Sequence, residues 1–324
     1  MQLSLTLDIP PLPAPIRHTD KLLLVGSCFT EHISDRLQHH KFTVVQNPHG
    51  ILFNPLSVAS SLNSYVAGTQ YTESDLFCLN ELWNSWDHHT RFSHTDRLQA
   101  LAGINESQSA AAAMVRQADW VMITLGSAFQ YYLKENGQPV ANNHRAPAQW
   151  FEKRMLSITD IITALCNCIT NIATVNPNAQ ILLTISPVRH IRDGVTDNNR
   201  SKARLIEAVH ELCAMHTNAH YFPAYELVID ILRDYRYYDI DFVHPNYMAT
   251  SYVWEHFVKA CIATEAYDLM VRVNDLMTAK GHRTRFPDTD AHRRFKESYL
   301  AKTQSLKAQY PYLQLEDVER YFQP

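Results

Sequence analysis

Three short apolar runs, each followed by a small residue, constrain the fold of this chain more than any other feature. They are KLLLV at 21–25, WVMITL at 120–125 and QILLTI at 180–185, followed by Gly26, Gly126 and Ser186. Their brevity, their β-branched residues and the small residues that end them predict buried strands rather than helices.

Helical patterns lie between these runs. Segments 30–40, 107–117 and 158–175 carry apolar residues at helical spacing, and 42–46 and 220–222 are two further candidate strands. Strands that alternate with helices predict the α/β class, with a mostly parallel sheet covered on both faces. Ligands of such sheets bind beyond the carboxyl ends of the strands, so the residues directly after each strand are the first candidates for a site.

The chain divides into three parts by composition. Residues 1–20 are rich in proline and predict an extended arm over the surface, and residues 21–263 contain the α/β pattern. Residues 264–324 are more charged and helical, and predict a helical extension. This extension can pack on the domain, cover a cleft or mediate formation of a homodimer.

The overall composition is that of a globular protein. Of 324 residues 46% are hydrophobic, and the formal charge is -4 without any long basic run, so we expect no nucleic-acid partner. The first 20 residues lack the features of a signal peptide, and no uninterrupted apolar stretch reaches the ~18 residues of a membrane span. Six scattered cysteines indicate reduced thiols. These features predict a cytoplasmic protein without a membrane span.

Ser27 is the first candidate for chemistry. It follows a predicted strand and opens a predicted helix, where a hydroxyl meets backbone N–H groups and the positive end of the helix dipole. This position suits a nucleophile beside an oxyanion hole, although a serine there is also a common helix cap. Cys28 is a rival nucleophile, but neighbouring side chains in such a bend point in different directions, and we favour Ser27.

The second candidate is the pair Asp241 and His244 in the sequence DFVHP. A serine nucleophile needs a base, and a neutral imidazole base needs an acceptor that holds its tautomer. Residues three apart in a turn can make that contact, whereas a simple surface pair is the alternative. His190, after the predicted strand 180–185, is a rival base or an ordinary loop residue.

The residues around Ser27, LLLVGSCFTEHISDRL, resemble the GSCFA family, whose signature is Gly-Ser-Cys-Phe-Ala and which belongs with the SGNH/GDSL hydrolases. Thr30 stands where the signature has Ala. The segments NPHGILFNPLSV, LWNSWDHHTRFS, TLGSAFQY, VANNHRAP, TISPVRHIRDG and YFPAYELVIDILRDYRYYDIDFVHPN are similar to the same family, over about residues 20–260.

The resemblance implies a flavodoxin-like three-layer α/β/α fold. It also implies a triad with Ser27 as nucleophile, His244 as base and Asp241 as the residue that orients it, without a cofactor. The expected activity is that of a serine esterase or deacylase acting on a small O-acyl ester, an O-acetyl group on a carbohydrate.

Enzymes of this type complete the oxyanion hole with a glycine and an asparagine from two further sequence blocks. The corresponding candidates here, beside Ser27, are the backbone of Gly50 and Ser127. The asparagine of the third block is absent, which weakens the expected oxyanion hole. Three asparagines elsewhere are possible replacements: Asn47, Asn54 and Asn142.

Polar residues clustered between apolar elements predict contacts with substrate, with a solvated turn as the alternative. These residues are Asn142, Asn143, His144 and Arg145, to which we add His190. Several aromatic residues near predicted loops can stack on a sugar, but we assign them first to the core. They are Trp83, Trp86, Phe92, Tyr131 and Tyr132.

A metal site is the remaining possibility among the polar clusters. His210, Cys213, His216 and His220 have spacings that suit zinc. The segment is amphipathic, so these side chains are expected on its solvated face, and we expect no metal.

Two other functions remain open. An acyltransferase would use the same triad and differ only in its acceptor, so that acceptor-dependent turnover would identify it. A non-catalytic binding module on the same fold would explain the absent asparagine.

Overall fold

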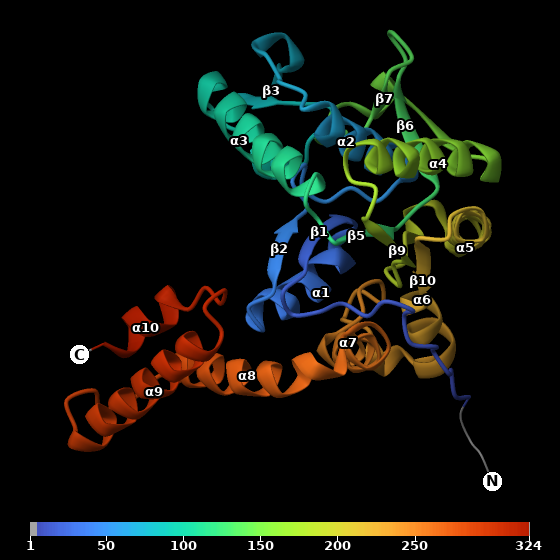
Figure 1. The fold of residues 1–324 in the computed structure, drawn as a ribbon. Helices are drawn as coiled ribbons and strands as arrows, with labels where there is room; N and C mark the ends of the chain where they lie inside the picture. Colours follow the sequence, from blue (N-terminus) through green and yellow to red (C-terminus); the bar gives the residue numbers. More distant parts are fainter. Residues whose placement is uncertain (1–4, 324) are drawn as a thin grey trace.

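The centre of the molecule is a five-stranded parallel sheet, seen in a computed structural model that describes residues 5–323 (Figure 1). Its strands are β1 (Lys21–Gly26), β2 (Thr43–Gln46), β5 (Trp120–Leu125), β9 (Gln180–Ile185) and β10 (Ala219–Phe222). They lie in the order β10-β9-β5-β1-β2, and every neighbouring pair is parallel. This is the strand order of flavodoxin-like sheets. The predicted fold class is therefore confirmed, and so are the five predicted strands.

Helices cover both faces of the sheet. One face packs against α2 (Pro55–Ala67), α3 (Arg97–Val115), α4 (Ile158–Val175) and α5 (Val195–Met215). The other packs against α1 (Cys28–His39), α6 (Ala224–Glu226) and α7 (Tyr247–Cys261). Successive side chains of β1 point to opposite faces of the sheet, so Leu23 packs in the core on the first face and Leu22 in the core on the second.

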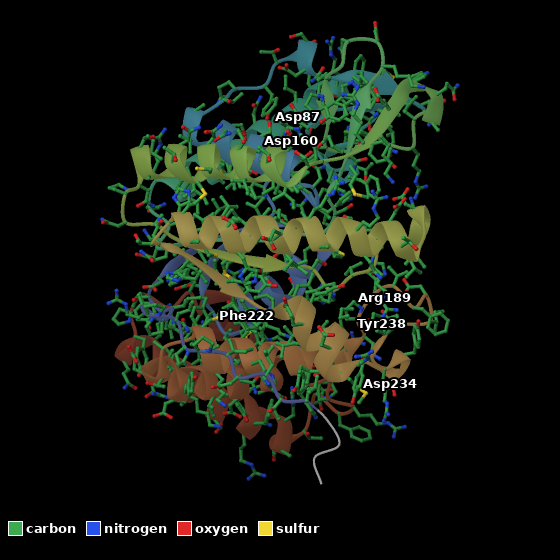
Figure 2. The ribbon with its side chains drawn as sticks, turned by 90° about the vertical axis from the view of Figure 1, so that its right-hand side faces the viewer. Asp87, Asp160, Arg189, Phe222, Asp234 and Tyr238 are labelled. Atoms are coloured by element: carbon green, nitrogen blue, oxygen red, sulfur yellow. The ribbon has the colours of Figure 1, made fainter. Side chains whose placement is uncertain are left out.

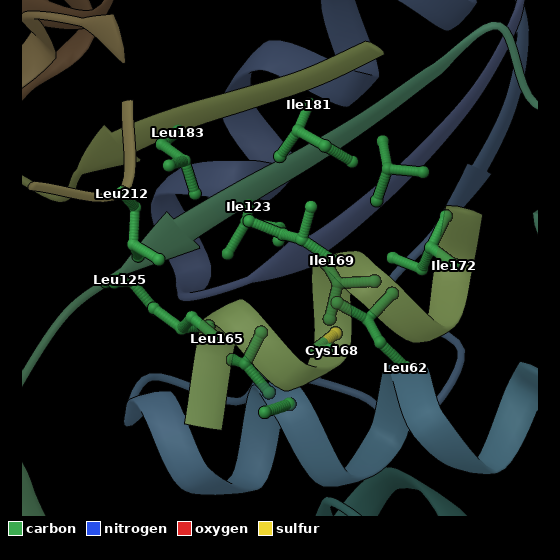
Figure 3. Close-up of a cluster of buried hydrophobic side chains, with 14 of the residues drawn as sticks. Leu62, Ile123, Leu125, Leu165, Cys168, Ile169, Ile172, Ile181, Leu183 and Leu212 are labelled. Atoms are coloured by element: carbon green, nitrogen blue, oxygen red, sulfur yellow. The ribbon is translucent and has the colours of Figure 1, made fainter. Parts of the chain in front are cut away.

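Helix α4 is central to the first core (Figure 3). Leu165 and Ile169 from α4 pack with Ile123 and Ile181 of the sheet. Among the described residues, α4 is the one helix long and apolar enough to span a membrane by composition, with a mean hydropathy of 1.4. Of that window 28% is buried, and its buried apolar residues pack against the sheet.

Two small antiparallel sheets were not predicted from the sequence. One pairs β3 (Phe77–Leu79) with β4 (Leu82–Asn84), and the other has the order β7-β6-β8. Its strands are β6 (Phe129–Leu133), β7 (Pro139–Val140) and β8 (Phe151–Met155). Trp86 stacks on Phe77 with 3.7 Å between ring centroids, which agrees with its assignment to packing. These strands are too short to show a clear alternation.

The remaining short elements connect the layers. The chain has 3₁₀ turns at Glu73–Asp75, Thr90–Phe92, Ala148–Trp150, Ile191–Asp193, Tyr235–Tyr237 and Thr264–Ala266, and a π-helix at Leu227–Leu232. The described part of the N-terminal arm lies against α7, where the Leu12 N–H donates to the carbonyl of Ala260 at 2.9 Å. Residues 1–4 of that arm lie outside the described residues.

The C-terminal helices form a separate layer at the end of the molecule opposite α4 (Figure 1). They are α8 (Tyr267–Gly281), α9 (Asp290–Gln309) and α10 (Glu316–Phe322), and they share their own apolar core. The imidazole of His40 contacts the carbonyl of Met270 at 3.1 Å, and Lys41 pairs with Asp317 at 2.7 Å. These contacts lie beyond the last turn of α1, at the end of the helix opposite Ser27.

Candidate active site

Ser27 lies in the turn between β1 and α1, beside the end of β5. It is 2% exposed, and its hydroxyl accepts a hydrogen bond from the Phe29 N–H at 3.3 Å as the N-cap of α1. Because β2 follows α1 on one side of β1 and β5 lies on the other side, this turn is the topological switch point of the sheet. The hydroxyl therefore sits at the position where open parallel sheets bind ligands.

Glycines allow the backbones to approach Ser27. Gly26 has φ +149°, and a Cβ there would lie 2.2 Å from the carbonyl oxygen of Thr124. A Cβ on Gly126 would lie 3.4 Å from the Cβ of Ser27 and 3.1 Å from Nε2 of His190. Gly126 is thus the common neighbour of Ser27 and His190.

Asp241 and His244 are in contact, as the sequence predicts. Oδ2 of Asp241 lies 2.6 Å from Nδ1 of His244, and Oδ1 accepts the backbone N–H groups of Val243 and His244 at 2.9 and 3.0 Å. The hydrogen bonds from the His244 imidazole and from these N–H groups lower the pKa of Asp241 to about 2. A carboxylate only accepts, so Nδ1 carries the proton and Nε2 is left as an acceptor.

The His244 turn is attached to the loop that carries His190 through Arg189 of that loop, which lies next to Tyr238 (Figure 2). The Arg189 N–H donates to the carbonyl of Val243 at 3.2 Å, and its guanidinium lies over the ring of Tyr238 at 4.3 Å. His190 follows Arg189 and lies next to Gly126. His244, the predicted base, follows Val243. The described residues contain no hydrogen bond from Ser27 to an imidazole, and the side chains of Asp241 and His244 are 45% and 47% exposed.

His190, the rival base, lies beside Gly126 and therefore close to the Ser27 turn. Its ring packs on that of Phe53, with 5.2 Å between the ring centroids, and its Nε2 is buried without a hydrogen-bond partner. Burial, then the charge of Lys202 and that of His244, lower the pKa of His190 to about 3. This imidazole is therefore neutral over the whole physiological range.

The predicted oxyanion donors are already engaged. The N–H groups of Ser27, Gly50 and Ser127 donate to the carbonyls of Thr124, Asn47 and Phe53 at 3.1, 2.7 and 2.9 Å. The hydroxyl of Ser127 accepts the N–H of Phe129 at 3.2 Å. In contrast, no other described residue accepts the N–H of Cys28, the first residue of α1. The sequence predicts backbone N–H donors at the start of this helix, although the N–H of Cys28 was not singled out among them.

The thiol of Cys28 is a poor rival to Ser27. Burial, and then the charge of Glu31, raise its pKa. A protonated thiol is a weak nucleophile.

The asparagines proposed as replacements have structural partners. Asn47 accepts the Gly26 N–H at 2.8 Å, and Asn54 caps α2 through the Ser57 N–H at 2.9 Å. Asn142 accepts the N–H of His144 at 2.8 Å. The side-chain oxygen of Asn47 therefore ties the end of β2 to the end of β1, and those of Asn54 and Asn142 hold local turns in place.

The loop 142–145 is a tight turn. His144 and Arg145 have φ values of +48° and +58°, and the side chain of Asn143 accepts the Arg145 N–H at 3.2 Å. His144 is 7% exposed and contacts the carbonyl of Ser85 through Nε2 at 2.7 Å. Nothing in these contacts joins the loop to Ser27.

Three buried polar residues of α5 border the site and were not predicted. Asn198 accepts the His190 N–H at 2.8 Å, Ser201 accepts the Ala128 N–H at 2.7 Å, and Lys202 donates to the carbonyl of Gly126 at 2.6 Å. Their spacing in the sequence could have indicated that they are buried, because they lie on the same face of the helix as Leu205, Val209 and Leu212.

The residues considered for metal binding have other neighbours. His216 contacts the sulfur of Cys166 at 3.4 Å, His220 contacts Gln180 at 3.3 Å, and His210 packs on Tyr221. Within residues 5–323, no group of three or more His, Cys, Asp or Glu side chains is arranged to hold a metal ion.

The fold and this site define an α/β protein with a serine at the switch point of a flavodoxin-like sheet. A model of the GSCFA family matches residues 21–257, and one described as "GSCFA domain protein, C-terminal domain" matches residues 273–324. The chain therefore belongs to the GSCFA family.

Comparison with solved structures gives matches of low similarity, whereas none of the curated proteins matches the sequence. An acetyl xylan esterase from the rumen bacterium Butyrivibrio proteoclasticus is 12% identical with a TM-score of 0.36, covering 76% of this chain and 64% of the esterase. A mutant acetyl-xylooligosaccharide esterase from Geobacillus Stearmophilus is 12% identical with a TM-score of 0.39, covering 76% of this chain and 96% of that one.

Proposed function

We propose that this protein is a serine esterase that removes a small acyl group, an O-acetyl group, from a carbohydrate. The observation that carries the proposal is the position of the Ser27 hydroxyl at the switch point of the sheet. The Asp241 and His244 pair supports it, since their turn is bonded to the loop that reaches the same point.

In the proposed reaction, Oγ of Ser27 adds to the ester carbonyl while Nε2 of His244 takes its proton. Asp241 stabilises the resulting imidazolium, which then protonates the leaving alcohol. Water attacks the acyl-enzyme by the same steps in reverse. Because Ser27 makes no hydrogen bond to His244 in this structure, the proposed reaction requires the exposed His244 turn to move toward Ser27. Catalytic hydrogen bonds often shorten only in the substrate complex.

The oxyanion would be bound at the start of α1. The N–H of Cys28 lacks a partner and lies at the positive end of the helix dipole. Such a donor is worth about 3 kcal/mol in the transition state.

A groove beside the His244 turn supports a sugar as the leaving group. It has a volume of about 960 Å³ and begins at Pro245, directly after His244, between α1, α7 and α8. Its lining combines aromatic rings, including Tyr247, with carboxylates, including Asp35 and Glu255. Aromatic rings stack on the apolar faces of sugars, and carboxylates accept bonds from their hydroxyls.

The test is labelling with a fluorophosphonate, followed by intact-mass measurement and peptide mapping, for the native protein and Ser27→Ala. We expect one adduct, on Ser27, that Ser27→Ala abolishes. Absence of an adduct in the folded native protein would refute the proposal.

The sugar assignment has its own test. Tyr247→Ala should raise KM for an O-acetylated oligosaccharide and leave KM for 4-nitrophenyl acetate unchanged. Tyr321→Ala, which alters an exposed tyrosine of α10, serves as the control. An equal effect of Tyr247→Ala on both substrates would contradict the assignment.

A second candidate function is a non-catalytic ligand-binding module. It is favoured by the three predicted oxyanion donors, whose N–H groups are all bonded within the protein. Such a module would fold normally, bind an acetylated sugar and resist the fluorophosphonate.

A further inference from the structure

Lys202 is a buried lysine without an acidic partner. It is 1% exposed on α5, and its Nζ donates to the carbonyl oxygens of Gly126 and Ser186, each at 2.6 Å. None of the ion pairs in the described part of the chain includes it. Burying an amine without a counter-ion costs folding free energy, and an apolar side chain would avoid this cost. A gain in stability is therefore a poor explanation for the residue.

The two carbonyls that Lys202 binds follow adjacent strands of the sheet. Gly126 comes directly after β5 and Ser186 directly after β9, so the ammonium group joins the carboxyl ends of both strands. Gly126 is also the common neighbour of Ser27 and His190. Lys202 thus holds the backbone that borders the proposed nucleophile.

We propose that Lys202 is a positioning residue for the acylation of Ser27, acting through Gly126 and supplying positive charge behind the oxyanion. The inference rests on the proposed esterase function. Nζ binds two carbonyls and need not touch the substrate. Its charge lies at the carboxyl ends of β5 and β9, beside the switch point where the proposed reaction develops a negative charge on the ester oxygen. A fixed charge in a dry site acts strongly on such a charge.

Three titratable groups face Lys202 from the surrounding elements: Cys28 of α1, His190 of the loop after β9, and Tyr225 of α6, whose ring centre lies 5.8 Å from Nζ. Burial raises the pKa of Cys28 and of Tyr225, and lowers the pKa of His190 to about 3. Burial lowers the pKa of Lys202 itself to about 7, against the opposing effect of Cys28. Lys202 is therefore the member of this cluster that changes charge near neutral pH.

The charge of Lys202 determines how the rate of acylation depends on pH. Lys202 is cationic below its pKa, so its assistance is present at lower pH and is lost as the pH rises through about 7. The rate of acylation should then fall on the alkaline side.

The experiment measures the second-order rate of fluorophosphonate labelling at Ser27 from pH 5 to 9, together with thermal unfolding. The variants are Lys202→Met, which removes the charge and keeps a similar length, and Lys202→Arg, which keeps the charge at every pH. Lys259→Met, at an exposed position of α7, is the control.

The native protein and Lys259→Met should show the alkaline fall. Lys202→Met should label about tenfold more slowly at pH 6 and lack the fall. Lys202→Arg should be labelled faster than Lys202→Met, and its labelling rate should likewise show no fall at alkaline pH. A purely structural role would alter the melting temperature and leave the shape of the profile unchanged.

Native labelling that rises steadily to pH 9 would overturn the inference, even if neither variant folds. So would a folded Lys202→Met with the native rate and profile. In both cases Ser27 is labelled and the esterase proposal survives, whereas no labelling of the native protein refutes both.

Discussion

The guanidinium of Arg189 lies 4.3 Å from the centre of the Tyr238 ring, and this contact joins the loop after β9 to the turn that carries His244 (Figure 2). The backbone bond from Arg189 to Val243 strengthens the same junction. In the proposed mechanism the exposed His244 turn moves toward Ser27, and this attachment to the loop beside Ser27 would limit how far the turn can move away.

Arg189→Ala should therefore affect catalysis more than stability. A cation–π contact at a partly exposed site is worth about 0.5–1 kcal/mol, so the melting temperature should change little. A base displaced by about 1 Å can cost 100-fold, and we expect kcat for 4-nitrophenyl acetate to fall about 10- to 100-fold. Arg236→Ala removes an exposed arginine that pairs with Asp234 and should leave kcat unchanged. Equal kcat values for the two variants would count against this role of Arg189.

Asp241→Asn tests the tautomer of His244. The amide oxygen can still accept the two backbone N–H groups, so the turn should keep its shape and the protein its stability. The amide nitrogen would face Nδ1, which favours the wrong tautomer, and kcat should fall by up to about 10⁴-fold. Steady-state kinetics and a melting curve on the same sample measure both quantities, and native kcat in this variant would remove Asp241 from the mechanism.

The α/β class could be predicted because its signals are local. The runs around Leu23, Ile123 and Leu183 are apolar on both faces, and this pattern belongs to buried parallel strands. The small sheets around Phe77 and Tyr131 give no such signal, since their strands have two to five residues. These strands form because the packing of their side chains against the rest of the domain outweighs their weak intrinsic strand propensity.

The site was partly predictable for the same reason. Asp241 and His244 are three residues apart, so one turn brings them together. Lys202 is far from Ser27 in the sequence, and a lysine in a helical pattern indicates solvent. Only the fold shows that its Nζ meets two carbonyls, one of which belongs to Gly126, the neighbour of Ser27.

Gly26→Ala tests the close approach of β1 and β5. The new Cβ would lie 2.2 Å from the carbonyl oxygen of Thr124, at a positive φ that alanine rarely adopts. We expect the free energy of unfolding in urea to fall by about 3 kcal/mol. Gly103→Ala is the matched control, because it lies within α3 with open space around it and should gain about 0.5–1 kcal/mol. Similar stabilities of both variants would show that the strands can move apart.

His190 and His244 are the two imidazoles that the sequence offers as candidates for the base, and their substitution decides between them. The pKa of His190, lowered to about 3 by burial, makes it a weak base, so proton transfer from a serine hydroxyl to it is unfavourable. His244 is exposed and oriented by Asp241, which suits a base. His244→Ala should therefore lower the rate of fluorophosphonate labelling by about 10³-fold or more.

His190→Ala should lower that rate by only about tenfold, through loss of its packing against Phe53 and Gly126. Labelling rates at pH 7.5 and melting curves for both variants give the comparison. The opposite ranking would transfer the role of base to His190, with Asp241 and His244 reduced to a structural pair in the turn.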